Sequence, residues 1–221
     1  MKYLLTVTSG FTVFGDLMPL ILKIENVKAL FTGFECQEGV ERLPNGSQAK
    51  NYVLHSNNKI ITIRNYRLDI QYNYEVGTID DFLYFVNQVS EKIKSAFNLR
   101  FNRIAYISSQ FVRREEMTMA NFNEAFNVPS VFGEDAKEVQ FRVNHIYNIL
   151  GEPTNAVLIA QDGTVQKRGE DTKEKVIIIN NDINTLAENK ENRFDWQTSI
   201  NLLKEYIKLA AQRSNRVVGT L

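Results

Sequence analysis

Cysteine, histidine and proline are scarce in this chain, with one cysteine, two histidines and four prolines among 221 residues. The single Cys36 cannot form an intramolecular disulfide, which suits a reducing compartment. A structural zinc site needs three or four cysteine, histidine or carboxylate ligands at suitable spacing. Because His55 and His145 also lie far apart in the sequence, these absences exclude a disulfide framework and argue against structural zinc.

An excess of charge of one sign is also absent, since 26 basic residues balance 26 acidic ones. Balanced charge removes the simplest case for tight binding to nucleic-acid phosphates and leaves only a local basic patch to consider. No apolar run approaches the roughly 18 residues that a membrane-spanning helix needs. The N-terminal stretch 3–14 is threonine-rich and has no small-x-small cleavage pattern, so we interpret it as strand and expect a cytoplasmic protein.

The motifs of the commonest enzyme classes are missing as well. The sequence has no GxxxxGK[ST] or GxGxxG phosphate-binding loop. It has no GxSxG nucleophile elbow, which weakens a hydrolase interpretation. We therefore expect no cofactor and favour a protein that is not an enzyme.

What the chain does contain is a long series of strand patterns. Branched and aromatic residues, in places alternating with polar ones, are typical of half-buried strands. The predicted strands are 2–8, 11–14, 27–36, 51–55, 59–64, 66–74, 101–112, 139–149, 156–160 and 176–179. Turns are predicted at Ser9–Gly10, Leu43–Gly46, Ser56–Asn58 and Gln161–Gly163. Asparagine is frequent, and we expect it at turns and helix caps.

Two long amphipathic helices stand out against this background. Thr78 can cap a helix over 79–97, in which apolar residues recur at three- and four-residue steps on one face. Asp195 can cap a last helix whose apolar stripe runs from Trp196 to Ala210. A further helical segment is predicted at 115–126, and the charged stretch 167–175 is predicted to be a loop.

The order of these segments predicts an α+β fold. Antiparallel sheets carry long amphipathic helices on one face, because the strands lack the regular intervening helices of a parallel sheet. Residues 1–98 and 99–221 each have the pattern of a strand meander followed by a helix. We interpret the two segments as possible pseudo-repeats within one globular unit.

One basic cluster is a candidate binding surface for nucleic acid. Arg103, Arg113 and Arg114 are interleaved with aromatic residues, and this combination can hold phosphates and stack bases of single strands. Alternation places Phe101, Arg103 and Ile107 on one face, which favours a core role for the aromatics, and the adjacent glutamates neutralise the last two arginines. A solvated strand end is the favoured interpretation, with binding through the three arginines as the alternative.

A second candidate cluster could hold a divalent ion. Asp171, Glu174 and Asp182 flank the predicted strand 176–179, and acids near strand ends can bind a hard cation that activates water. The spacing is generic, so metal-dependent nuclease or nucleotide hydrolase chemistry remains an alternative rather than the expectation.

The cysteine and the histidines carry weaker signals. Cys36 could pair with His55 or His145 as a nucleophile, but a small apolar residue in a strand explains it more simply. His145 lies on the apolar face of its strand, so we expect it to be buried and neutral. We expect His55, next to a turn, to be exposed.

One stretch of sequence resembles a known family. The order of IITIRNYRLDIQYN, IDDFLYFVNQVSEKIKSAF and NRIAYISSQFV, with WQTSINLLKEYIKLAAQR at the end, is similar to a sporadically distributed family of uncharacterised bacterial α+β proteins. The resemblance covers residues 50–112 and the last helix. That family tends to have Arg-Tyr-x-Asn in its arginine-led strand, and Ile107–Ser109 departs from that pattern. The resemblance implies a fold but no catalytic role.

Taken together, the residues favour a non-enzymatic binding protein. A well-patterned fold without a convergent set of catalytic residue types suggests recognition rather than catalysis. Antiparallel sheets with unpaired edges are templates for strand addition. We expect a sheet surface or edge that binds a protein partner or a second copy of the chain.

Overall fold

The structure is a computed structural model that describes residues 4–43, 45–74, 77–113, 140–166 and 173–220. Its strands are β1 (Leu4–Phe14), β2 (Glu35–Arg42), β3 (Gln48–Ser56), β4 (Lys59–Arg64), β5 (Arg67–Asn73), β6 (Arg103–Arg113), β7 (Gln140–Ile149), β8 (Glu152–Gln166) and β9 (Lys173–Thr185). Its helices are α1 (Met18–Leu22), α2 (Ile24–Leu30), α3 (Ile79–Ala96) and α6 (Trp196–Thr220). None of the described helices is long and apolar enough to cross a membrane.

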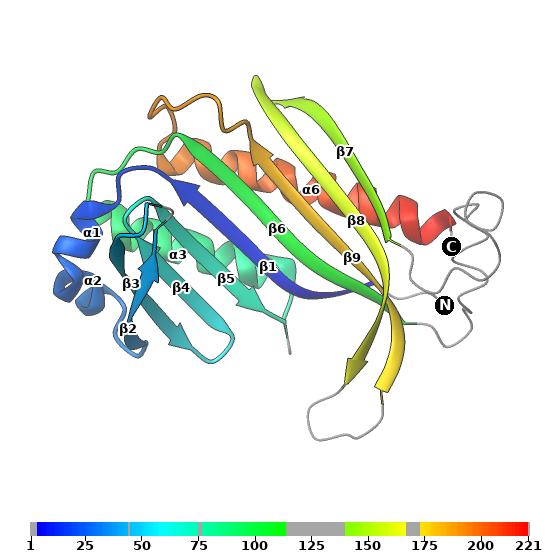
Figure 1. Cartoon of the computed structure of the whole chain (residues 1–221), viewed down its shortest axis with the longest axis horizontal. Helices are drawn as coiled ribbons and strands as arrows, with labels where there is room; N and C mark the ends of the chain where they lie inside the picture. Colours follow the sequence, from blue (N-terminus) through cyan, green and yellow to red (C-terminus); the bar gives the residue numbers. More distant parts are fainter. Residues whose placement is uncertain (1–3, 44, 75–76, 114–139, 167–172, 221) are drawn as a thin grey trace.

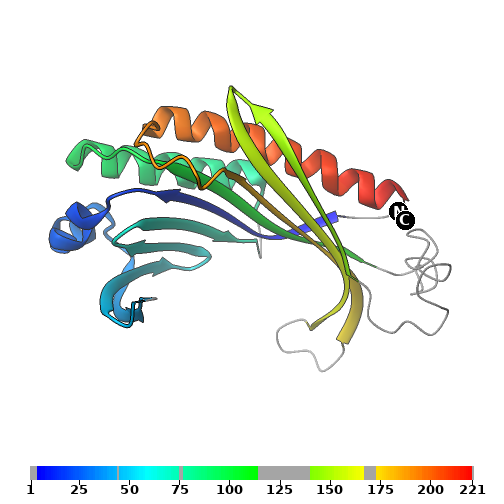
Figure 2. The same ribbon diagram turned by 45° about the horizontal axis from the view of Figure 1, so that its top comes forward.

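All nine described strands form one antiparallel sheet in the order β2-β3-β4-β5-β1-β6-β9-β8-β7. The long helices α3 and α6 lie together on one face (Figure 1). Figure 2 shows that β2 and β3 at one end, and the tips of β8 and β9 at the other, bend away from these helices. The opposite face, which we call the open face, is therefore concave. The predicted α+β class, with helices on one face of an antiparallel sheet, is confirmed.

The halves 1–98 and 99–221 both contribute to this sheet. β1 of the first half pairs with β6 of the second at its centre. On each side the last strand of a meander comes next, β5 beside β1 and β9 beside β6. Each half also ends in a long helix. The duplication of the two halves stays a prediction.

The core fills the space between the sheet and the two long helices. Phe11, Leu68, Phe82, Leu203 and Tyr206 come from both helices and from strands of the sheet, and none of them is exposed. A buried side chain of this size contributes roughly 1.5–3 kcal/mol by leaving water. This buried interface supports the sheet from the side opposite the open face.

The two predicted helix starts are confirmed. Thr78 and Asp81 form a capping box at α3, in which each side chain accepts a hydrogen bond from the other residue's backbone N–H. Asp195 accepts a hydrogen bond from the backbone N–H of Thr198 at 2.7 Å, in the first turn of α6. The turns at Asn45–Gly46 and Asn57 are confirmed too, since Gly46 and Asn57 have positive φ.

One predicted strand and two predicted turns differ from the structure. Of the predicted strand 27–36, residues 27–30 belong to the helix α2, from which Val27 reaches the core, and only residues 35–36 are strand, at the start of β2. Ser9–Gly10 is not a turn, because β1 runs through it and pairs on both sides. Gln161–Gly163 is not a hairpin either, because β8 continues to Gln166. The segment 115–126 lies outside the described residues, and of the predicted loop 167–175 the described residues 173–175 belong to β9.

Candidate functional site: the open face and the free edge of the sheet

The open face carries a row of mainly polar residues across the sheet. The register aligns Asp69 of β5, Thr12 of β1, Ala105 of β6, Asn184 of β9 and Asn155 of β8 in one row across the sheet. Further asparagines on strands of this face are Asn73 and Asn180. The expectation that asparagine serves turns and caps is therefore wrong for these positions, where the amides cover a sheet surface.

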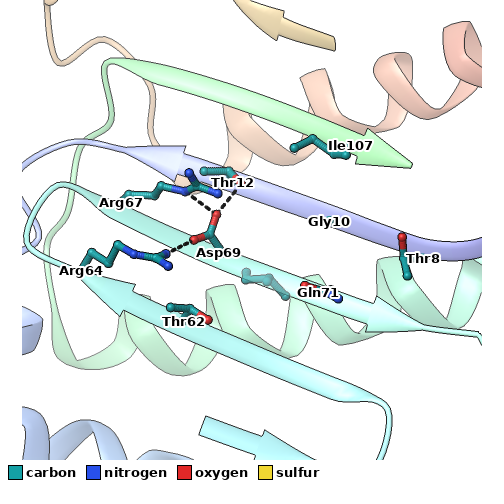
Figure 3. A pocket seen from close by; sticks show the side chains of 10 residues that line it. Thr8, Gly10, Thr12, Thr62, Arg64, Arg67, Asp69, Gln71 and Ile107 are labelled. Atoms are coloured by element: carbon teal, nitrogen blue, oxygen red, sulfur yellow. Dashed lines mark hydrogen bonds and ion pairs between the residues drawn. The ribbon is translucent and has the colours of Figure 1, made fainter. Parts of the chain in front are cut away.

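A hollow of about 270 Å³ lies in the middle of this face, over β4, β5, β1 and β6. Its lining comprises Thr8, Gly10, Thr12, Thr62, Arg64, Arg67, Asp69, Ile70, Gln71 and Ile107. Figure 3 shows Gly10 and the threonines at its floor and the two arginines beside Asp69. The hollow is small for a drug-sized ligand, and its size suits a compact polar group.

Asp69 organises the charged end of the hollow. Its Oδ1 accepts hydrogen bonds from Thr12 Oγ1 at 2.7 Å and from Arg67 Nε at 2.6 Å. Its Oδ2 accepts one from Arg64 Nη1 at 2.5 Å. Arg64 Nε in turn donates to Glu41 at 2.9 Å. Charge-assisted bonds of this kind fix both guanidinium groups in place. The residues that form this network were missed in the sequence, although the alternation of Arg67, Asp69 and Gln71 marks a wet face.

Arg103, one of the predicted binding residues, lies beside the hollow. Its guanidinium stands 4.9 Å from the centroid of the Phe14 ring, and that of Arg67 stands 5.7 Å from the same ring. Arg103 Nη2 donates to Asn184 at 3.0 Å, while its Nε is buried without a hydrogen-bond partner. Arg103 therefore extends the basic edge of the hollow toward β9.

The described residues do not place Arg113 or Arg114 beside the hollow. Arg113 ends β6 and pairs with Val176, ten positions along the strand from Arg103, which pairs with Phe14. The side chain of Arg113 and all of Arg114 lie outside the described residues. Joint binding through the three arginines stays a prediction.

The acids proposed as a metal site do not converge. Glu174 and Asp182 belong to the same strand β9, where they pair with Val165 and Val157. Eight residues of strand separate them by about 26 Å. Asp171 lies outside the described residues. No cluster of three or more histidine, cysteine or acidic residues able to hold a metal ion occurs in the described part of the chain.

Cys36 and the histidines do not form a reactive group either. Cys36 is partly buried against the core, and burial raises the pKa of its thiol, which disfavours the nucleophilic thiolate. His55 Nε2 on β3 lies 3.5 Å from Glu35 Oε2 on β2. The prediction of a buried His145 is wrong, because this residue is exposed on the outermost strand, where helix packing does not cover it.

That outermost strand, β7, is the second notable feature. It pairs with β8 on one side, and no described strand pairs with its other side. Most of its side chains are exposed, including Val143 and Ile146, which is 62% exposed. Its sequence QFRVNHIYNI has one charged residue, Arg142, and neither proline nor lysine. Edge strands of natural proteins usually carry such residues to prevent pairing.

The turn between β7 and β8 defines which backbone groups of β7 face outward. Leu150 and Gly151 both have positive φ, at 52° and 85°, as in a two-residue type I′ turn. The closing pair Ile149 and Glu152 then exchanges hydrogen bonds, and alternate residues do the same along the ladder. The N–H and C=O groups of Arg142, Asn144, Ile146 and Asn148 consequently point away from β8.

The opposite edge strand, β2, is different in composition. Its sequence ECQEGVER carries three glutamates and one arginine in eight residues. Glu38 forms an ion pair with Lys50 of β3 at 2.7 Å. Such charges oppose the approach of another strand. The two ends of the sheet therefore differ, and β7 is the edge without this protection.

A groove of about 290 Å³ runs between the end of β7 and α6. It is lined by Tyr147–Leu150 and by Glu205, Lys208, Leu209 and Gln212. Farther along, Arg213 of α6 donates a hydrogen bond from Nη2 to the carbonyl of Val143 at 3.1 Å. Its Nη1 is buried without a hydrogen-bond partner. Helix α6 thus supports β7 from the helix side without covering it.

Comparison with models of protein families, with curated proteins and with solved structures gives no match.

Proposed function

We propose that this protein is a non-enzymatic binding protein that self-associates when β7 of one copy pairs with β7 of a second copy in an antiparallel manner. The observation that carries the proposal is the unprotected edge of β7, with outward backbone groups at four alternate positions between Arg142 and Asn148. Each outward N–H or C=O in such an edge can form an intermolecular hydrogen bond. The contrast with the charged strand β2 supports β7 as the interface.

The composition of β7 suits pairing with itself. An antiparallel arrangement centred on Asn144–Ile146 places Arg142 of each copy opposite the uncharged end of the other strand, so no like charges meet. Ile146 of each copy would stand opposite Asn144 of the other and diagonal to the second Ile146. A closed two-fold pair also removes this edge from both copies, which prevents further growth of the sheet.

The surroundings of β7 support the same arrangement. A strand added to β7 would approach the groove between β7 and α6 and reduce the exposure of Tyr147, Ile149 and Leu209. The α6 helices of the two copies would then lie under one continuous sheet. Burial of apolar side chains from both copies adds to the backbone hydrogen bonds in stabilising the pair.

Sedimentation velocity over a range of concentrations tests the proposal. We expect the wild-type chain to reach twice its 25.5 kDa mass in the micromolar range. The variant Ile146→Lys, which places a charge in the middle of the pairing edge, should weaken dimerisation at least about tenfold. The matched control Val40→Lys introduces the same charge at an exposed branched residue of β2 and should leave dimerisation unchanged.

Two results would contradict the proposal. A wild-type chain that stays monomeric at about 100 µM, far above a micromolar dissociation constant, would exclude self-association through β7. A dimer that is weakened equally by Ile146→Lys and Val40→Lys, or by Val40→Lys alone, would place the interface elsewhere.

A further inference from the structure

Gly10 leaves part of the hollow on the open face free of a side chain. Gly10 lies inside β1, and a Cβ added there would come no closer than 3.9 Å to another atom, the carbonyl oxygen of Ile107. Its φ is not in the positive range and its neighbours leave room, so neither backbone nor packing requires glycine at this position. A glycine inside a strand weakens the strand and often marks the close approach of a ligand.

The groups around the hollow are mainly unused donors. Arg67 has only its Nε engaged, by Asp69, and within the described part of the chain its two terminal amino groups have no hydrogen-bond partner. Arg64 donates from Nε and Nη1, and its Nη2 has no hydrogen-bond partner among the described residues. Two guanidinium groups held by one carboxylate form a preorganised donor set.

The carboxylate at the hollow is already occupied. Both oxygens of Asp69 accept hydrogen bonds, three in total. Its side chain is only 17% exposed, and Thr12 beside it is only 4% exposed. A cation would have to compete with two arginines for this carboxylate. An anion, in contrast, would meet free N–H donors, with the exposed side chain of Ile107 forming an apolar wall.

We propose that the hollow binds a compact oxyanion, the carboxylate or phosphate group of a small molecule, between Arg67 and Arg64 and over Gly10. The site is separate from the proposed dimer edge, because β9 and β8 lie between β6 and β7. It goes beyond self-association and does not depend on it. Planar guanidinium groups bind carboxylate and phosphate oxygens through paired hydrogen bonds, which is the chemistry that both classes share.

Titration monitored by NMR, with inorganic phosphate and with succinate as separate probes, tests the site. We expect saturable shifts of the Arg67 Nε–Hε signal and of the Gly10 backbone amide, and weaker binding at higher ionic strength. Saturation by phosphate alone would assign a phosphate ligand, and saturation by succinate a carboxylate. If neither probe gives a saturable shift up to about 50 mM, the proposal is wrong.

Three variants locate the binding. Arg67→Gln should weaken the affinity at least about tenfold, because it removes a charged donor pair. Gly10→Val should weaken binding by placing a side chain on the floor of the hollow while the chain stays folded, since a branched side chain suits a strand and the space is available. Arg42→Gln removes an exposed arginine of β2 and should bind as the wild type does. Wild-type affinity of folded Gly10→Val, or an equal loss in Arg42→Gln, would overturn the proposal.

Discussion

The side-chain amide of Asn181 on β9 donates a hydrogen bond to Ser214 Oγ on α6 over 3.0 Å, and neither residue is exposed. Ser214 Oγ in turn donates to Gln110 Oε1 on β6 at 2.6 Å. This short chain of polar groups crosses the interface between the sheet and the helix. It sets α6 against β9 and β6 at the end of the sheet where the second, smaller apolar cluster lies.

Removal of the serine hydroxyl should therefore destabilise the fold. Ser214→Ala leaves the buried amide of Asn181 without its acceptor, and we expect a loss of about 1–3 kcal/mol in the free energy of unfolding. Urea denaturation measures it. Ser95→Ala removes an exposed hydroxyl from α3 and serves as the control, with a change near zero. Equal stability of the two variants would contradict a structural role for the polar chain.

Arg193 joins three parts of the chain. It donates to Glu152 at 3.0 Å at the start of β8 and to the carbonyl of Asn102 at 2.7 Å before β6, and its guanidinium lies over the Phe194 ring. Because both charged side chains are about four-fifths buried, Arg193→Met should cost about 2 kcal/mol of stability. A double-mutant cycle with Glu152→Gln isolates the pair, and a coupling energy near zero would show that the ion pair contributes nothing.

Stability at acid pH should reflect the cap of α6. The backbone N–H of Thr198 lowers the pKa of the Asp195 carboxyl by hydrogen bonding. Since the folded pKa lies below the unfolded value, the carboxylate contributes stability that is fully present above about pH 4 and is lost as pH falls through the folded pKa. Asp195→Asn, which keeps a capping side chain, should be less stable than wild type at pH 7 and equal to it at about pH 2. A constant difference in urea midpoints at both pH values would contradict this prediction.

Replacement of two strand glycines by alanine should change the stability of the protein in opposite directions. A Cβ at Gly163 would lie 2.5 Å from Ile178 Cδ1, so Gly163→Ala should destabilise the protein by about 1–3 kcal/mol through overpacking. Gly10→Ala has room for its Cβ and should stabilise by about 0.5–1 kcal/mol. Thermal unfolding of both variants compares them. Destabilisation by Gly10→Ala would mean that glycine at position 10 is required by the fold.

The elements that the sequence predicts well are those whose signal is local. The helix 79–96 combines a cap with an apolar face, and both are properties of neighbouring residues. The strand predicted at 27–36 is wrong for residues 27–30, because these residues belong to a helix whose buried face depends on what packs against Val27. Gly163 resembles a turn residue, but its real constraint is contact with Ile178 on the neighbouring strand. Such contacts between strands depend on register, which composition does not specify.

The candidate site likewise combines local features, which the sequence predicts, with contacts between distant segments, which it does not. Alternation around Asp69 predicts a polar face, but the meeting of Arg64, Asp69 and Thr12 requires the pairing of β4, β5 and β1. The position of β1 between β5 and β6 joins segments that are far apart in the chain. The exposure of His145 likewise follows from the place of β7 at the end of the sheet. These features were therefore not predictable from local sequence.

Amide hydrogen exchange tests the central claim, pairing of β7 with its copy, most directly. The outward amides of Asn144, Ile146 and Asn148 should be protected at high protein concentration and should exchange rapidly on dilution, while the outward amides of β2 exchange rapidly throughout. Protection that follows the dimer fraction measured by sedimentation would support the account. Rapid exchange of the β7 amides in a sample that is fully dimeric would contradict it.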